Sequence, residues 1–327
     1  MTADRAAPTS AAVATGAGFR VTAPGTDRPL QLRDGAFHDT GAHHPCVDGV
    51  WDLVDATRRE AVDTFARDYA AVRAAEARTP PSPEAVRALP YADLTGELEG
   101  MWAERAASFD RFLAALDPTD GTVVDLGAGC GWLAARLAGA GWTAAAVDVT
   151  VDGGDGLGTA RWHDRDLFLV RAEMDRLPLA TGSVDLAVFN ASLHYAPDVS
   201  SALDEAQRVV RPGGLIAVLD SPVFTDPAAG AAMVAEFAAA TVAAHGVAPA
   251  AHFGPGYVAE ADLQRFVRTH RPAAVTRVDD RRGPVGALRS LVGARRAGRE
   301  IAKRPLLLFE TRANHRHGKD HQWEDGR

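Results

Sequence analysis

The pattern of apolar and polar positions is most regular between residues 122 and 222. Apolar runs typical of strands alternate there with amphipathic stretches that have helical spacing. The runs are TVVDLGAG, WTAAAVDVT, LFLVRAEM, SVDLAVFNASLHY and LIAVLDSPVF, and the clearest helical stretches are GWLAARLAGAG and VSSALDEAQRVV. Alternation of this kind is typical of a parallel, doubly wound sheet. We therefore predict an α/β fold with a mostly parallel, Rossmann-like sheet.

The segments around this region predict accessory parts on both sides of the sheet. Short β-type runs with a hairpin turn at Asp34-Gly35 precede two helical stretches, at 57–79 and about 96–117. A late strand is expected at 304–311. The predicted division is a disordered leader (1–16), a small β module (17–56), a helical cap (57–118), the sheet domain (119–312) with a lid insertion at about 223–300, and a flexible basic tail (313–327).

Composition narrows the class of protein. The 327 residues are 46% apolar and 24% charged, as in ordinary globular proteins. Two cysteines cannot form a disulfide framework, which favours a reducing, cytoplasmic setting. Charged or glycine residues interrupt the longest apolar stretches before a membrane-spanning length of about 20 residues, and the N-terminus does not read as a secretory signal.

Charge is unevenly distributed along the chain. The net charge of −8 argues against a general affinity for nucleic acid. Residues 281–327, however, hold 12 Lys or Arg against 5 Asp or Glu. This basic end is either a solvated face or a surface that meets an anionic substrate or partner.

A glycine-rich loop joins the first strand of the regular region to its helix. Asp125 is followed by Gly127, Gly129 and Gly131, an acidic-x-G-x-G-x-G pattern. Such loops lie at the carboxyl ends of parallel strands, where ligands bind, although a tight turn without a ligand is an alternative. A nicotinamide-dinucleotide fingerprint requires a glycine where this chain has Trp132, so a dehydrogenase is disfavoured.

Two acidic residues follow at the ends of the next two strands. Asp148 comes about 20 residues after the glycines, where a carboxylate accepts hydrogen bonds from ribose hydroxyls. Glu173 follows the third strand, at a place suited to an adenine amino group beside the backbone of Met174. A solvated strand-end Asp and a surface-loop Glu remain the structural alternatives for these two residues.

The run from Val123 to Phe224 resembles a class I S-adenosylmethionine-dependent methyltransferase of the small-molecule type 11 kind. The matching pieces are VVDLGAGCGWLAARLA, AVDV, AEMDRLPLATGSVDLAVFNASLHY and VVRPGGLIAVLDSP. They cover about 100 residues in the order of that family. The resemblance implies S-adenosyl-L-methionine as the cofactor.

The resemblance also implies roles for individual residues. The loop from Asp125 through Gly127, Ala128 and Gly129 to Gly131 would hold the methionine part of the cofactor. Asp148 with Val149 would hold the ribose, Glu173 with Met174 the adenine, Asn190 would line the methyl-donor pocket, and Trp102 would cap the cofactor. The long loop after Asp148 departs from the family pattern and makes Asp152 and Asp155 competing contacts.

Residues on the acceptor side follow the fourth strand. His194 is the candidate general base, because an imidazole titrates near neutral pH; packing over the cofactor is its alternative. Tyr195 and Phe224 are predicted to line the substrate pocket. The NASL sequence after the fourth strand lacks the Asn/Asp-Pro-Pro-aromatic run of exocyclic-amine methyltransferases.

The two cysteines and their neighbours are not predicted to be reactive. His38, His43, His44 and Cys46 lie close together, but structural zinc sites draw on two separated pairs of ligands, so we predict a β module without metal and keep a bound metal as the alternative. Cys130 lies inside the glycine loop, where a buried filler is expected.

Together these features predict a cytoplasmic, biosynthetic enzyme that transfers a methyl group to a small-molecule acceptor, such as a secondary metabolite or a peptide-like compound. Neither a membrane nor nucleic acid is an expected partner. The alternative is a protein that binds the cofactor without transferring the methyl group and acts as a regulatory or scaffolding partner. The sequence leaves the acceptor, the methylated atom and the oligomeric state open.

Overall fold

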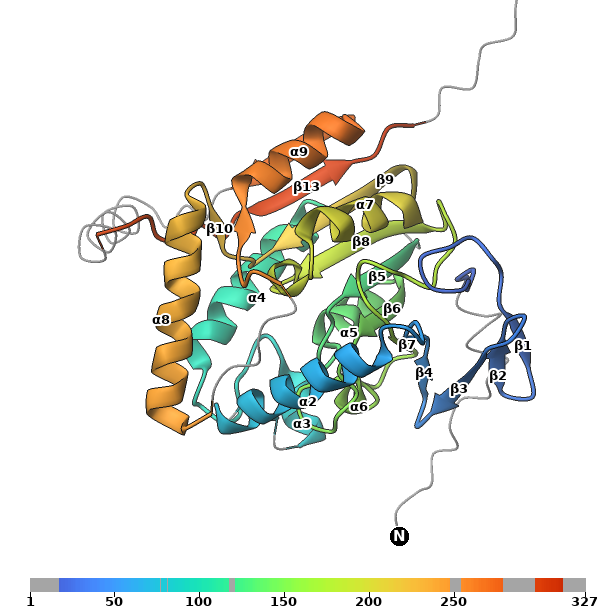
Figure 1. Cartoon of the computed structure of the whole chain (residues 1–327), viewed down its shortest axis with the longest axis horizontal. Helices are drawn as coiled ribbons and strands as arrows, with labels where there is room; N and C mark the ends of the chain where they lie inside the picture. The colour runs from blue at the N-terminus through green and yellow to red at the C-terminus, as the bar shows by residue number, and fades with distance from the viewer. Residues whose placement is uncertain are drawn as a thin grey trace, which may run out of the picture.

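The computed structural model describes residues 18–76, 78–80, 82–117, 121–247, 254–278 and 298–313. The predicted leader, the arginine-rich run 281–297 and nearly all of the predicted tail lie outside these residues. Within the described residues a central sheet contains eleven strands in the order β1-β2-β3-β4-β7-β6-β5-β8-β9-β13-β12 (Figure 1). This mixed, largely parallel sheet confirms the predicted fold class.

The middle of the sheet is parallel. It consists of β5 (Thr122–Leu126), β6 (Thr143–Asp148), β7 (Phe168–Arg171), β8 (Val184–Asn190) and β9 (Val210–Leu219). From β5 the chain proceeds outward through β6 to β7 and then returns to β8 on the other side. Ligands in doubly wound sheets bind at such a reversal, beyond the carboxyl ends of the strands.

The N-terminal strands extend this sheet. They are β1 (Gln31–Arg33), β2 (Ala36–His38), β3 (His43–Val47) and β4 (Val50–Asp52), which form antiparallel pairs in chain order. Asp34 and Gly35 form the β1–β2 turn with positive φ angles, as predicted. Strand β4 pairs in parallel with β7, so these strands do not stand apart as a module: Trp51 is buried and packs on Phe37.

Part of the predicted lid belongs to the opposite edge of the sheet. Strand β12 (Ala274–Val278) pairs with β13 (Leu306–Glu310), which runs antiparallel to β9. The short strands β10 (Val223–Phe224) and β11 (Val258–Ala259) form a separate parallel pair. Of this stretch, helix α8 (Pro227–His245) alone among the described elements lies apart from the layers (Figure 1).

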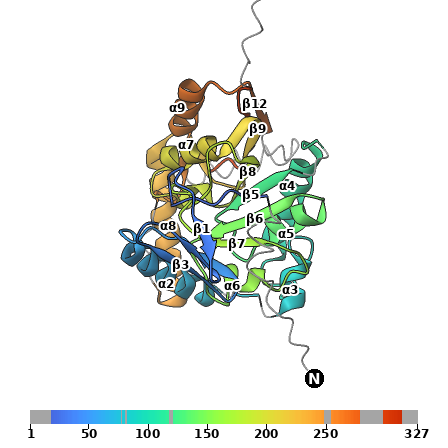
Figure 2. The same ribbon diagram turned by 90° about the vertical axis from the view of Figure 1, so that its right-hand side faces the viewer.

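Helices cover both faces of the sheet (Figure 2). One face carries α4 (Glu99–Ala114), α5 (Trp132–Gly139) and the short α6 (Leu157–Ala160), and the other carries α7 (Val199–Val209) and α9 (Glu260–His270). Each face has its own apolar core, with Phe112 and Leu137 buried in one and Leu203 and Phe266 in the other. Helix α7 starts at Asp198, whose side chain accepts a hydrogen bond from the Ser200 amide.

The remaining helical elements surround the carboxyl ends of the parallel strands. They are α2 (Arg59–Ala75), α3 (Pro83–Ala88) and the 3₁₀ turn η1 (Leu193–Tyr195). Helix α2 buries Val62, Phe65 and Val72, which repeat at helical spacing. Together with α4 it closes the space beyond the strand ends.

Helix α8 is alanine-rich and mostly exposed, and Phe237 and Val242 reach solvent. Among the described residues it is the one helix long and apolar enough to cross a membrane. Judged by length and composition alone, a single helix of this kind is weak evidence for a span.

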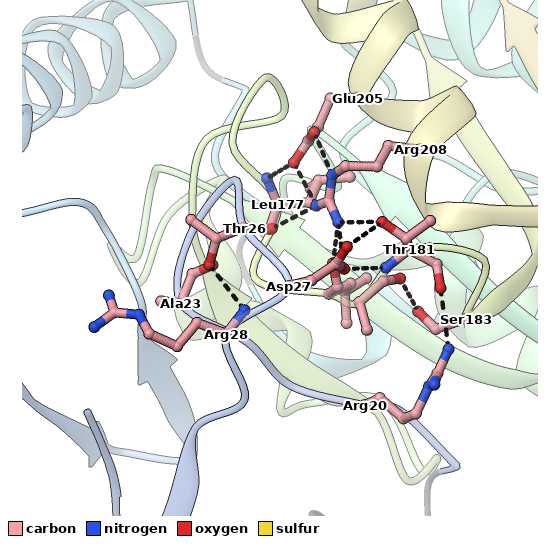
Figure 3. Close-up of polar contacts among 12 residues, drawn as sticks. Arg20, Ala23, Thr26, Asp27, Arg28, Leu177, Thr181, Ser183, Glu205 and Arg208 are labelled. Carbon is pink, nitrogen blue, oxygen red and sulfur yellow. Dashed lines mark hydrogen bonds and ion pairs between the residues drawn. The ribbon is translucent and has the colours of Figure 1, made fainter. Parts of the chain in front are cut away.

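The chain before β1 is held against α7 by a compact polar cluster (Figure 3). Asp27 accepts hydrogen bonds from the amide and hydroxyl of Thr181, at 2.7 and 2.8 Å. Arg208 donates to the carbonyls of Leu177 and Leu179 and pairs with Glu205. The Asp27–Thr181 contacts connect residues 154 positions apart and anchor the N-terminal segment on the sheet domain.

Candidate active site

A cavity opens beyond the carboxyl ends of β5, β6, β7 and β8 and is closed by α2 and α4. Its volume is about 1080 Å³, including the part open to solvent. The cavity therefore lies where the doubly wound topology predicts a ligand.

The glycine loop forms the floor of this cavity. Gly127 and Gly131 have φ angles of 74° and 73°, in the left-handed region that glycine adopts without strain. A Cβ atom on Gly127 would lie 2.4 Å from Cβ of Ser192, and one on Gly131 would lie 2.8 Å from Cβ of Ala160. Gly127, Ala128 and Gly129 line the cavity, whereas Gly131 shapes the loop from outside the lining.

Asp148 ties the loop to the end of β6. Its Oδ2 accepts a hydrogen bond from the Gly129 amide at 2.7 Å, and its Oδ1 accepts from the amide and hydroxyl of Thr150. Burial raises its pKa, and these hydrogen bonds act in the opposite direction. The carboxylate lines the cavity beside Val149 and keeps lone pairs for a ligand hydroxyl.

Asp125 occupies a buried position at the start of the loop. Its side chain is 1% exposed, and Oδ2 accepts a hydrogen bond from the Ala134 amide. Burial raises its pKa to about 8, and the nearby Asp148 charge adds to that shift. At neutral pH the carboxyl group is therefore mostly protonated and acts as a neutral anchor of the loop.

Several acceptor atoms at the strand ends have no hydrogen-bond partner. Glu173 pairs through Oε1 with the Arg58 guanidinium at 2.7 Å, while its Oε2 is buried and unpaired. The Oδ1 atoms of Asp175 and Asn190 are also buried without a partner. All three side chains line the cavity, and unpaired buried acceptors are costly, so this region is built to receive donor groups.

The predicted base, His194, does not line the cavity. Its Nδ1 lies 3.3 Å from Oγ of Ser221, and its ring packs against Tyr195 with centroids 4.3 Å apart. Successive side chains of the η1 turn point in different directions, and Tyr195 is the one that faces the cavity. No histidine is among the described residues that line it, so His194 does not face the cavity in this geometry.

Phe224 also lies away from the cavity. It is fully buried at β10 and packs edge-on against Tyr257, with ring centroids 5.9 Å apart. The structure thus places Phe224 in a packing contact under α8 rather than in a substrate wall. Residues 248–253 of the predicted lid insertion lie outside the described residues.

Trp102 lines the cavity from α4, as expected of a capping residue. Its ring lies edge-on to Trp132, with centroids 6.1 Å apart, and the Arg105 guanidinium lies 5.0 Å from its ring centroid. Arg105 therefore makes a cation–π contact with the Trp102 ring within the protein. Met174 also lines the cavity, beside Glu173.

Cys46 and the three histidines of the N-terminal strands form no metal-binding cluster. His38 and His43 pack ring against ring, and His44 Nδ1 lies 3.3 Å from the Asp52 carbonyl oxygen. The described residues contain no group of three or more His, Cys, Asp or Glu placed to hold a metal. Cys130 is buried in the loop, and burial raises its pKa to about 12, which keeps the thiol neutral.

Sequence reasoning did not identify the wall opposite the strand ends. Phe65, Tyr69 and Arg73 of α2 line the cavity at four-residue spacing, and Arg78 lines it just after the helix. The helical period of α2 was visible in the sequence, but the apolar residues gave no indication that an arginine shares their face. In the sequence, the sign of such a wall is an arginine that continues the four-residue spacing of the apolar residues, as Arg73 does after Phe65 and Tyr69.

The sequence comparison with known families matches residues 124–218 to a family model described as a methyltransferase domain. A demethylmenaquinone methyltransferase of Corynebacterium kroppenstedtii is 34% identical over 128 residues, which are 39% of this chain and 51% of that protein. An uncharacterized chloroplastic methyltransferase of Arabidopsis thaliana is 53% identical over 49 residues, 15% of this chain and 14% of that protein. The chain thus spans about half, or less, of the length of these curated relatives.

A malonyl-[acyl-carrier protein] O-methyltransferase of Buchnera aphidicola is 30% identical over 95 residues, 29% of this chain and 37% of that protein. Among solved structures, a SAM-dependent methyltransferase of Thermotoga maritima is 17% identical with a TM-score of 0.42, covering 67% of this chain and 95% of that one. The family model covers the glycine loop, Asp148, Glu173 and Asn190. These residues are the ones that the structure gathers along one side of the cavity.

Proposed function

We propose that this chain, whose residues 124–218 match a family model described as a methyltransferase domain, is a class I methyltransferase that transfers a methyl group from S-adenosylmethionine to a small-molecule acceptor. The observation that carries the proposal is the set of unpaired buried oxygens on Glu173, Asp175 and Asn190 beside a loop that only glycine can form. Each of these oxygens can accept a hydrogen bond from a donor group of a ligand in the cavity.

The donor groups of S-adenosylmethionine fit this set of acceptors. The cofactor carries an adenine amino group, two ribose hydroxyls and an ammonium group, all of which donate hydrogen bonds. Asp148 is the acceptor for the ribose, Glu173 for the adenine amino group, and Asn190 faces the region next to the loop. The rest of the loop, from Asp125 to Gly131, supplies backbone for the methionine part.

The reaction requires alignment and the exclusion of water more than proton transfer. The bound cofactor supplies a methyl group on a positively charged sulfur, which makes it an activated donor. The residues of this chain hold the acceptor in line with that group: Tyr69, Trp102 and Tyr195 surround the space with aromatic rings that displace water. With His194 outside the cavity, we assign it no part in the transfer.

The acceptor is proposed only as a small molecule or a peptide-like compound. The curated relatives are named for different acceptors, which include demethylmenaquinone, a malonyl-carrier protein and arsenite. We further propose a cytoplasmic setting with no membrane or nucleic-acid partner, which the two free cysteines and the net charge of −8 support.

Calorimetry with S-adenosylhomocysteine, the product form of the cofactor, tests the proposal. We expect the wild-type chain to bind it and Asp148→Ala to weaken binding by more than tenfold, because the substitution removes both the ribose acceptor and the support of Gly129. Asp68→Ala, at an exposed position of α2, is the matched control and should bind like the wild type. Thermal melts of each variant report folding separately, and a wild type that binds no S-adenosylhomocysteine contradicts the proposed function.

A further inference from the structure

Three arginines share one wall of the cavity. Arg73 comes from α2, Arg78 from the segment after it and Arg105 from α4. They line the wall that faces the strand ends, and none is part of the glycine loop or of the acceptor set described above. Three guanidinium groups in one partly buried wall are costly unless anions neutralise them.

Carboxylates of the protein neutralise this wall only in part. Arg73 pairs with Asp155 at 2.7 Å, and Glu76 is shared between Arg73, at 3.7 Å, and Arg78, at 2.9 Å. Arg105 has no ion pair within the described part of the chain; it lies over the Trp102 ring. Within the described residues, these two carboxylates lie within ion-pair distance of the three guanidinium groups, and Asp220 interacts electrostatically with Arg105 without such a contact.

The environment of Arg78 reflects this imbalance. Its Nε is buried without a hydrogen bond, since the nearby Glu76 oxygen is poorly aligned with it, and one of its terminal nitrogens donates to Sδ of Met101. Burial lowers its pKa, and the positive charges of Arg73 and Arg105 lower it further. The Arg78 guanidinium shares the Glu76 carboxylate with Arg73, contacts a thioether and is repelled by two arginines, so it can bind an added anion.

The cofactor would bring charges of both signs into the cavity. S-adenosylmethionine brings a sulfonium and an ammonium against one carboxylate, so its binding adds positive charge to the cavity. Between the arginines, Tyr69, Leu98, Met101 and Trp102 provide an apolar and aromatic surface. The wall therefore combines charged donors with space for a flat, apolar body.

We propose that the acceptor is a small organic anion with an apolar or aromatic body, whose carboxylate binds Arg73, Arg78 and Arg105 while another of its atoms receives the methyl group. This inference rests on the proposed methyl transfer and names its substrate class. The carboxylate anchors the acceptor and is not the group that is methylated. Pairing with guanidinium groups withdraws charge from its oxygens and weakens them as nucleophiles.

The transfer balances with a hydroxyl or amine elsewhere on the acceptor. A lone pair on that oxygen or nitrogen forms the new bond to the methyl carbon, while the carbon–sulfur bond breaks and its electron pair stays on sulfur as a neutral thioether. The proton displaced from the acceptor leaves to water. The carboxylate of the acceptor keeps its charge throughout the transfer.

Matched probes test whether the acceptor binds through its carboxylate. Wild-type protein saturated with S-adenosylhomocysteine is titrated with 3-(4-hydroxyphenyl)propionate, with its uncharged amide and with 4-hydroxyphenyl phosphate, and binding is followed by ligand-observed NMR and calorimetry. We expect the carboxylate to bind at least tenfold more tightly than the amide. Arg105→Met should remove most of that preference, whereas Arg111→Met, at an exposed position of the same helix, should keep it.

Each outcome decides the inference. Equal binding of the acid and the amide, or no binding of either at 1 mM, overturns it, and stronger binding of the phosphate assigns the wall to a phosphorylated acceptor instead. A tenfold loss of S-adenosylhomocysteine affinity in Arg105→Met assigns the arginine to the cofactor and also overturns it. Failure of the wild type to bind S-adenosylhomocysteine is a failure of the proposed function itself, and that arm is measured first.

Discussion

At the scale of single residues, buried polar groups set the shape of the glycine loop. His163 is 9% exposed, and its Nε2 lies 3.0 Å from the Cys130 carbonyl oxygen. Burial lowers its pKa to about 4, while this hydrogen bond acts in the opposite direction. The neutral ring therefore supports the outer side of the loop, and the His163 side chain also lies near Gly131.

We expect the protein to lose stability as the pH falls from 6.5 toward 4, in part because of His163. The unfolded chain binds a proton at His163 near pH 6.5, whereas the folded chain does so only near pH 4. The stabilisation is therefore complete above pH 6.5 and is lost at up to about 1.4 kcal/mol per pH unit below it. Urea unfolding at pH 7, 6 and 5 measures this, and the same pH dependence in His163→Gln would contradict it.

At the scale of elements, the strand–loop–helix unit of β5 and α5 combines backbone and side-chain constraints. Gly127 turns the chain directly under Ser192, whose hydroxyl donates to the Leu126 carbonyl at 2.5 Å. The amides of Gly127 and Ala128 both donate to the Val147 carbonyl. The loop is thus fixed between β6 and the chain that follows β8.

Gly127→Ala should disrupt the site at this loop. The new Cβ would meet Ser192 at 2.4 Å, and a φ of 74° is unfavourable for alanine, so the backbone has to move. We expect a loss of about 1–3 kcal/mol in the free energy of unfolding and at least a tenfold loss of S-adenosylhomocysteine affinity by calorimetry. Gly100→Ala in α4, with open space around the new methyl group, is the control, and unchanged affinity in Gly127→Ala would refute the expectation.

At the scale of the whole molecule, distant parts of the chain are joined into one body. The N-terminal strands continue the sheet through β4 and β7, and the cluster around Arg208 and Asp27 ties the preceding segment to α7 (Figure 3). Arg208 is the centre of this cluster, because its guanidinium reaches two backbone carbonyls and the Glu205 carboxylate. The cluster lies away from the cavity, so it supports the fold and not the chemistry.

Arg208→Met should lower the free energy of unfolding by about 2–4 kcal/mol, since it leaves Glu205 and two carbonyls without their charged donor. Urea unfolding measures the loss, and S-adenosylhomocysteine affinity at low temperature should stay near that of the wild type. The exposed Arg67→Met is the matched control. A change in stability no larger than in this control would show that the N-terminal segment is held by other contacts.

The sequence by itself determined the features that depend on neighbours along the chain. Alternating apolar runs predicted the parallel sheet and its flanking helices, Asp34-Gly35 predicted the hairpin turn, and glycine spacing predicted the loop. Placement after strands brought Asp148, Glu173 and Asn190 to the same cavity, because the carboxyl ends of parallel strands meet at one edge.

Only the tertiary structure decided which side chains meet across long separations. It joined β4 to β7, turned His194 away from the cavity and Tyr195 into it, and brought the arginines of α2 and α4 together on one wall. A local pattern specifies the period of an element and the face that is buried, but not the partner packed against that face. Those choices depend on contacts between residues that are far apart in the chain, and the arginine-bearing wall of the cavity consists of such contacts.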